Sequence, residues 1–179
     1  LKKDFKKASE IAQASSVDFA QLLDMCAAKF PKTRFRFSTS NPQDMSLDVI
    51  HVMAKHKNIC KYIHLPAQSG NSRILEKMNR TYDRDWYLQK VSDIRRILGD
   101  DCAISTDMIS GFCSETEEEH QDTLDAMRNA KYTMSYMFYY SERPGTMAAR
   151  KYEDDIPLEI KKKRLTEVVK LQGEISLAA

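Results

Sequence analysis

The stretch YIHLPAQSG, residues 62–70, decides the fold of this chain. It begins like a buried strand and then breaks, after Pro66, into a polar hook that contains Gln68, Ser69 and Gly70. An apolar helical pattern follows directly. A strand that leads into a helix is the repeating unit of parallel sheets covered by helices. The sequence therefore predicts an α/β protein and raises the question of what the hook holds.

The same alternation recurs on both sides of this stretch. Helices are predicted at 17–29, 45–55, 72–78, 84–98, 116–130 and from Pro157 onward, and further strands at 34–40, 102–109 and 133–141. Four parallel strands are too few to close a barrel, so we expect an open sheet. The buried stripe of the last helix is predicted to contain Ile160, Leu165, Val168, Val169 and Leu171. Its basic run, 161–164, is predicted to be solvated, with at most a weak contribution to binding an RNA backbone.

The composition is ordinary for a globular domain. The chain has 179 residues, of which 42% are hydrophobic and 30% charged, and its formal net charge is +2. A nearly balanced charge predicts neither nucleic-acid binding nor membrane binding. No apolar run has the length of a transmembrane helix, and the first residues do not form a signal peptide. We expect a cytoplasmic protein and, because the chain does not begin with Met, a piece of a longer one.

The four cysteines are Cys26, Cys60, Cys102 and Cys113. None shares a CxxC or CxxxC spacing with another, which argues against a local zinc or iron–sulfur motif within this chain. We therefore expect no metal ligands here and interpret the four as reduced thiols that pack as small hydrophobic side chains.

Polar residues stand at every predicted strand end. The ends are STS (38–40), PAQSG (66–70), STD (105–107) and YYSERPGT (139–146). Alternation places Tyr62 beside His64 and Ser105 beside Asp107, so one face of the sheet is predicted to carry a polar stripe. A parallel sheet covered on both faces is normally apolar throughout. Because ligands bind at the carboxyl ends of parallel strands, this edge is the predicted functional site.

Structural roles compete with this interpretation. Gln68 and Ser69 also fit a turn with a helix cap, and Arg143 fits a residue that braces a turn. The run 114–117 fits a capping box at the start of a helix. Asp107 is harder to dismiss, because a carboxylate late in an apolar strand needs a partner or a ligand.

Longer segments carry a resemblance to a known family. They are RFSTSNPQDM (36–45), IHLPAQSGNSRILEKMNR (63–80), STDMISGFCSETEEEH (105–120) and YYSERPGT (139–146). Together they resemble the radical S-adenosylmethionine methylthiotransferases over nearly the whole chain, in order and at family spacing. Within the family, the branch that modifies isopentenyl-adenosine in tRNA is the most similar. The resemblance implies a partial, TIM-like (β/α)6 radical SAM barrel, of which about four strands are present here.

The resemblance also implies a reaction. S-adenosylmethionine bound to a [4Fe-4S] cluster yields a radical that attacks carbon 2 of the adenine next to the anticodon. A second [4Fe-4S] cluster supplies sulfur, and a second S-adenosylmethionine supplies the methyl group. The implied partner is the anticodon stem-loop of tRNA, whereas the sulfur donor is not identified.

The family assigns roles by position. Gln68, Ser69, Asp107, Ser141 and Arg143 resemble positions that contact S-adenosylmethionine or the substrate base. Ala67 stands where valine is usual, and Cys113 where proline or histidine is usual. Residues 1–179 correspond to the C-terminal portion of the radical SAM core domain. The N-terminal cluster domain, the CxxxCxxC loop and the TRAM domain have no counterpart in the chain, so we expect it to be inactive alone. Its exposed first strand is expected to permit dimerisation.

Three alternatives stay open. The methylthiotransferase for threonylcarbamoyl-adenosine in tRNA shares RPGT and QSG, whereas the ribosomal-protein aspartate methylthiotransferase usually lacks both the Arg-Pro and the QSG. From another class, the chain fits a non-catalytic α/β binding module on the same scaffold. A CxxxCxxC motif upstream of Leu1 in the parent reading frame separates the enzymes from the module.

Overall fold

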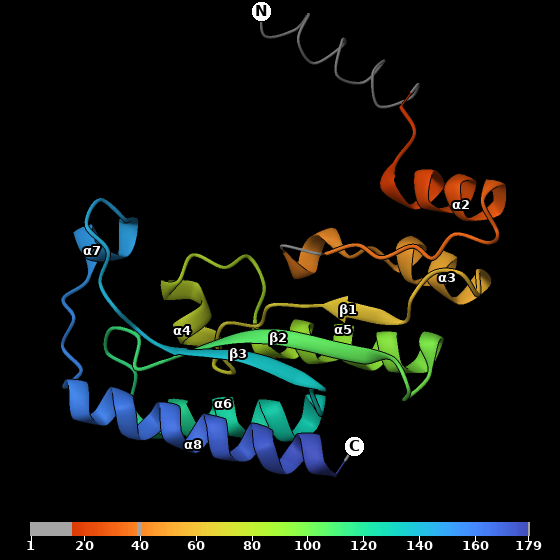
Figure 1. Cartoon of the computed structure of the whole chain (residues 1–179). Helices are drawn as coiled ribbons and strands as arrows, with labels where there is room; N and C mark the ends of the chain where they lie inside the picture. The colour runs from red at the N-terminus through yellow and green to blue at the C-terminus, as the bar shows by residue number, and fades with distance from the viewer. Residues whose placement is uncertain (1–15, 39–40, 179) are drawn as a thin grey trace, which may run out of the picture.

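The computed structural model describes residues 16–38 and 41–178, which form a parallel sheet with helices packed on it (Figure 1). The strands are β1 (Tyr62–His64), β2 (Ala103–Ser110) and β3 (Met134–Tyr139), in the order β1-β2-β3. The helices are α2 (Phe19–Lys29), η1 (Pro42–Asp44), α3 (Leu47–Lys55), α4 (Ser72–Lys77), α5 (Arg84–Leu98), α6 (Glu117–Ala130), α7 (Met147–Lys151) and α8 (Leu158–Leu177). In Figure 1, α5, α6 and α8 lie along one face of the sheet. The predicted α/β class is therefore confirmed.

The face of the sheet that meets these helices is the hydrophobic core. Ile63, Ile104 and Met108 are fully buried, and Ile63 lies opposite Ile104 in the parallel register of β1 and β2. Pairing continues beyond β1, because the Leu65 amide donates to the Ser105 carbonyl at 2.7 Å and Gln68 forms a bridge with Met108. The polar hook is therefore fastened to the sheet through its backbone.

Side-chain caps explain where the helices begin. Asp18 caps α2 and exchanges hydrogen bonds with Gln21, so each satisfies a free amide of the other. Thr116 and Glu119 form the same arrangement at α6. The box predicted at 114–117 was thus two residues early, because Ser114 has a left-handed backbone (φ 62°) in the turn before the helix.

The predicted strand at 34–40 does not form in the described residues. Phe35 makes a single parallel bridge to Ile59, and then Phe37 packs edge-on against the Phe19 ring of α2 at 5.2 Å. Residues 39–40 lie outside the described residues. Without a further described strand on its outer side, this segment gains too few ladder hydrogen bonds to stay extended. The sheet therefore has three described strands rather than four.

The predicted burial of α8 was confirmed for Val168 and Leu171, which are buried, and was wrong elsewhere along the helix. Lys161 and Arg164 are 4% and 5% exposed, whereas Ile160 and Val169 of the predicted stripe are 37% and 48% exposed. The buried face repeats through Lys161, Arg164, Val168 and Leu171 at helical spacing. The cause is electrostatic, because carboxylates pair with these two cations: Lys161 with Asp154, and Arg164 with the buried Glu115. Only Lys162 and Lys163 of the basic run are solvated.

None of the described helices combines the length and the apolar character that crossing a membrane requires.

Candidate functional site

The face of the sheet opposite α6 and α8 carries a connected row of polar side chains. The Ser105 hydroxyl lies 2.7 Å from the Tyr62 hydroxyl and 2.8 Å from His64 Nδ1. His64 Nε2 is in turn 3.6 Å from Asp107 Oδ1, and the His64 ring meets the Tyr136 ring edge-on. The polar stripe predicted from alternation is therefore confirmed. We call Tyr62, His64, Ser105 and Asp107 the polar row.

The polar row ends in a carboxylate that can still accept hydrogen bonds. The Asp107 side chain is 30% exposed, and its contact with His64 at 3.6 Å is longer than a hydrogen bond. A carboxylate offers acceptor positions on both oxygens, so those of Asp107 are available to a donor on the open face. Ribose hydroxyls and an ammonium group are donors of the required kind. Neighbouring Tyr136 is 48% exposed and supplies an aromatic surface beside it.

The hook residues differ in how they lie relative to the polar row. Gln68 is buried, and its backbone adopts the left-handed region (φ 72°). Its amide donates to the Asp107 carbonyl at 2.8 Å, and its carbonyl accepts from the Ile109 amide at 2.9 Å. Gln68 therefore adjoins Asp107 through the backbone, beyond the end of β1 at His64 and within the segment 66–70 that the sequence analysis named as a strand end.

Ser69 and Gly70 face α6 rather than the polar row. The Ser69 hydroxyl accepts from the Asn71 amide at 3.2 Å and lies 3.4 Å from Thr123 Oγ1. A Cβ on Gly70 would stand 2.5 Å from the Thr123 Cα, so α6 approaches the hook as closely as only glycine permits. This part of the hook fixes the distance between β1 and α6.

The other two predicted residues, Ser141 and Arg143, line a separate groove of about 700 Å³. It lies at the carboxyl ends of β2 and β3, bounded by the end of α4 and by α7, which Figure 1 shows at the same end of the sheet. The structure thus brings Ser141 and Arg143 together, and places Gln68, Ser69 and Asp107 outside the groove lining. Arg80 also lines it. Sequence reasoning missed Arg80, although the segment 63–80 ends on it.

Buried charges hold the turn after β2. Arg164 Nη1 lies 3.1 Å from Glu115 Oε1, and the same carboxylate oxygen accepts from the Gly111 amide at 2.8 Å. Burial raises the pKa of Glu115 to about 6, while the Gly111 amide and Arg164 oppose the shift. Lys161 pairs with Asp154 and donates to the Tyr140 carbonyl at 3.2 Å. Through these contacts α8 fixes one wall of the groove.

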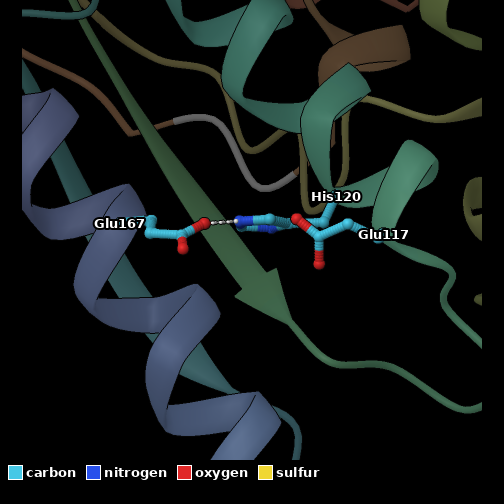
Figure 2. Close-up of side chains that lie close together, drawn as sticks. All are labelled: Glu117, His120 and Glu167. Carbon is cyan, nitrogen blue, oxygen red and sulfur yellow. Dashed lines mark hydrogen bonds and ion pairs between the residues drawn. The ribbon is translucent and has the colours of Figure 1, made fainter.

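A second polar cluster joins α6 to α8 on the covered side of the sheet (Figure 2). Glu117, His120 and Glu167 bring one potential ligand atom each within 4.8 Å of the others, as a divalent cation requires. Two cations already lie on these carboxylates, Arg164 at 3.5 Å from Glu117 and Lys163 at 3.8 Å from Glu167.

The histidine tautomer supports a structural role for this cluster. His120 Nε2 is 2.8 Å from Glu167 Oε2, whereas the buried His120 Nδ1 has no partner in the described part of the chain. A proton on Nε2 satisfies Glu167 and leaves only an unpaired acceptor at Nδ1. A metal on Nε2 would instead force a proton onto unpartnered Nδ1, opposite to the usual support of a histidine ligand. Burial lowers the His120 pKa, which also favours the neutral ring.

Two of the four thiols are buried. Burial raises the pKa of Cys102 to about 11 and also raises that of Cys113, so both are held as protonated thiols. Among the described residues, no group of three potential metal ligands includes a cysteine.

The fold and this arrangement of polar strand ends agree with what comparison shows. Residues 12–127 match the Radical SAM superfamily, and the chain belongs to that family. Coproporphyrinogen III oxidase from Escherichia coli, a radical SAM enzyme, superposes with a TM-score of 0.61 over 75% of this chain and 31% of that one. At 22% identity this supports the fold alone, a partial radical SAM barrel.

Relatives similar in sequence indicate a narrower class of protein than the superfamily does. The chain is 60% identical over 173 residues to the tRNA-2-methylthio-N(6)-dimethylallyladenosine synthase of Amoebophilus asiaticus. It is 59% identical over 172 residues to the enzyme of the same name from Flavobacterium psychrophilum. These alignments cover 97% and 96% of this chain and 36% of each relative. The predicted resemblance to the methylthiotransferases is therefore confirmed, and the chain spans about a third of the length of these relatives.

Proposed function

We propose that this chain is part of a tRNA methylthiotransferase that acts on carbon 2 of isopentenyl-adenosine next to the anticodon. The observation that supports this is the continuous similarity, along nearly the whole chain, to relatives named for that reaction. In this proposal, residues 1–179 form the C-terminal portion of the radical SAM core domain, and the active protein is cytoplasmic.

The proposed cofactors are S-adenosylmethionine and two [4Fe-4S] clusters. When bound, S-adenosylmethionine supplies the radical and the methyl group, and the second cluster supplies sulfur. The open face fits a nucleoside-like cofactor, because Asp107 offers acceptors for hydroxyl or ammonium groups beside the exposed ring of Tyr136. His64 and Ser105 hold the polar row in place from the neighbouring strand positions.

Each of the five predicted site residues has a part in this proposal. Asp107 contacts S-adenosylmethionine directly. Gln68 does so from the adjoining end of β1, and Ser69 supports it by holding the hook against α6. Ser141 and Arg143 contact the substrate side, because they line the groove at the carboxyl ends of β2 and β3.

The test of the cofactor site uses Asp107→Asn in the full-length protein, reconstituted anaerobically. We expect formation of 5′-deoxyadenosine to fall at least about tenfold, because the loss of a hydrogen bond to a charged group costs about 1.5–3 kcal/mol. The melting temperature should change little. The matched control is Asp101→Asn, which changes an exposed carboxylate just before β2, away from the carboxyl ends. Normal cleavage with a large loss of stability would make Asp107 a structural residue.

The substrate is tested separately by mass spectrometry of tRNA from cells that carry the full-length protein as their sole methylthiotransferase. Methylthiolated isopentenyl-adenosine supports the proposal. Methylthiolated threonylcarbamoyl-adenosine would assign the chain to the other tRNA branch, and the absence of both products would favour a binding module.

Dimerisation remains a proposal with a changed location. The first strand expected to carry it does not form in the described residues, and β1 and β3 are the outer strands of the described sheet, so we place the proposed contact at the edge of β3. An unpaired strand edge can pair with another chain. Light scattering that shows a monomer at all concentrations would exclude it.

A further inference from the structure

The groove beside β3 combines positive charge with aromatic surface. Its cationic side chains are Lys77, Arg80 and Arg143, and no acidic side chain is among the described residues that line it. Lys77 is already engaged, because its ammonium binds Ser114 and lies over the Tyr152 ring. The two arginines are therefore the groups that give the groove its binding potential.

Arg80 differs from three arginines on α4, α5 and α8 that pair with carboxylates. Arg73 binds Glu119 at 2.5 Å, Arg84 binds Asp125 at 2.5 Å, and Arg164 binds Glu115 at 3.1 Å. Arg80 is half-buried, its Nε has no hydrogen-bond partner, and no carboxylate of the described residues pairs with it. Arg164 Nε also lacks a hydrogen bond, but it lies 3.5 Å from a carboxylate oxygen of Glu117. Because nearly all buried donors are satisfied, the Arg80 Nε, which has neither kind of partner among the described residues, points to a missing acceptor.

The shape of that acceptor follows from guanidinium chemistry. A planar fork of donors matches the paired oxygens of a phosphate or carboxylate and binds them bidentately. Arg143, which is exposed on the loop between β3 and α7, also has no ion pair among the residues that the structure describes. Two unpaired guanidinium groups from separate segments suit an extended anion better than a single small one.

Exposed aromatic rings favour the phosphates of a nucleic acid over a carboxylate as the bound anion. Phe138 and Tyr139 line the groove and are 56% and 39% exposed, while Tyr140 is packed edge-on against Phe112 at 4.8 Å. Exposed rings beside unpaired arginines are the arrangement with which proteins bind single-stranded nucleic acid, stacking bases and neutralising phosphates.

We propose that Arg80, together with Arg143, binds backbone phosphates of the unpaired RNA loop that carries the target base, and that Phe138 or Tyr139 stacks on a base of the same loop. This rests on the proposed function, since it takes the substrate to be RNA. It assigns a phosphate-binding role to Arg80 and makes the groove a substrate site rather than a cofactor site.

The experiment measures binding of a fluorescent anticodon stem-loop to the full-length protein by anisotropy, without S-adenosylmethionine, across a salt series. We expect Arg80→Gln and Arg143→Gln each to weaken binding about tenfold, as for a hydrogen bond to a charged group. The slope of log K against log salt should fall by about 0.7 for each lost phosphate contact. Arg80→Lys should keep the slope but bind more weakly than wild type, because it keeps the charge without the fork.

The control is Arg128→Gln, an exposed arginine in the last turn of α6, with circular dichroism to confirm that each variant folds. RNA binding that is equal in wild type, Arg80→Gln and Arg143→Gln would overturn the inference. So would a selective loss of S-adenosylmethionine binding by calorimetry. A wild-type protein that neither binds this RNA nor forms a methylthiolated product refutes the proposed function as well, so the two failures are distinguishable.

Discussion

The two faces of the sheet differ in the burial of their side chains and in what those side chains contact. On the covered face, Ile104 and Met108 are fully buried beneath helices, and even the charged groups there have partners, as in the pair of Glu115 with Arg164. On the open face, alternate residues of the same strand β2 are Ser105 and Asp107, and its neighbour β3 exposes large aromatic rings. One side of this strand is therefore packed in the core, and the other is the side to which the proposed function assigns ligand binding.

This difference shows how the fold separates its tasks. Side chains on the covered face are packed in the core, and its buried charges are paired within the chain, so substitutions there should change the free energy of unfolding. Contacts on the open face end in unsatisfied acceptors and exposed rings, so substitutions there should change binding and leave stability nearly constant. The predictions below test this division, in order of decreasing effect.

The largest effect is expected at the buried ion pair of the covered face. Arg164→Met leaves the Glu115 carboxylate buried with the Gly111 amide but without its cation. Breaking a buried pair from one side typically costs about 3–5 kcal/mol, which chemical denaturation of the purified protein measures. Adding Glu115→Gln should recover much of the loss, because the uncompensated charge is then removed. A loss below about 1 kcal/mol would show that this ion pair does not stabilise the fold.

The pair of Glu115 with Arg164 also shows where sequence reasoning fails. The order of strands and helices was predictable, because hydrophobic periodicity marks each element and glycine or proline ends it. The polar row was predictable from alternation in β1 and β2. The buried side of α8 was not, since Lys161 and Arg164 look solvated until the carboxylates that neutralise them are known. The unpaired state of Arg80 among the described residues, on which its proposed role rests, was hidden for the opposite reason, because a missing partner leaves no trace in sequence.

The next largest effect is expected where the hook meets α6. Gly70→Ala puts a Cβ 2.5 Å from the Thr123 Cα and 2.7 Å from the Asp122 carbonyl oxygen, and these backbone atoms cannot move aside alone. Overpacking of this kind costs about 1–3 kcal/mol. The matched control is Gly173→Ala on α8, where an added Cβ meets nothing within 4 Å and alanine favours the helix. Equal stabilities of the two variants would mean that α6 does not lock the hook.

A smaller effect is expected from His120, and it depends on pH. Burial lowers its pKa in the folded protein below the usual 6.5, so the unfolded state binds a proton first as the pH falls. Stability from this group is present above pH 6.5 and is lost progressively below it, despite the nearby carboxylates of Glu117 and Glu167. His120→Gln keeps a donor for Glu167 but cannot titrate. Its unfolding free energy should therefore fall less than that of wild type between pH 7 and pH 5.

The pH experiment has an internal check of opposite sign. The pKa of Glu115 is raised to about 6, so its folded state binds the proton first and its contribution to stability grows as the pH falls from 7 toward 4.5. Glu115→Gln should remove that gain, whereas His120→Gln removes a loss. If both variants shift the pH dependence in the same direction, the assignment of one group is wrong.

The smallest effect is expected on the open face, where it completes the comparison. Tyr136→Ala removes a ring that is 48% exposed, whereas Ile104→Ala removes a fully buried side chain that lies directly opposite Ile63 in the register of β1 and β2. We expect a loss of about 0.5 kcal/mol or less for Tyr136→Ala, as for surface positions. Ile104→Ala should cost about 2–5 kcal/mol, because it opens a cavity in the core. Denaturant titrations of both variants measure the difference. A cost for Tyr136→Ala that approaches that of Ile104→Ala would mean that the open face contributes to folding, and would contradict the division between a stabilising side and a binding side of β2 and its neighbours.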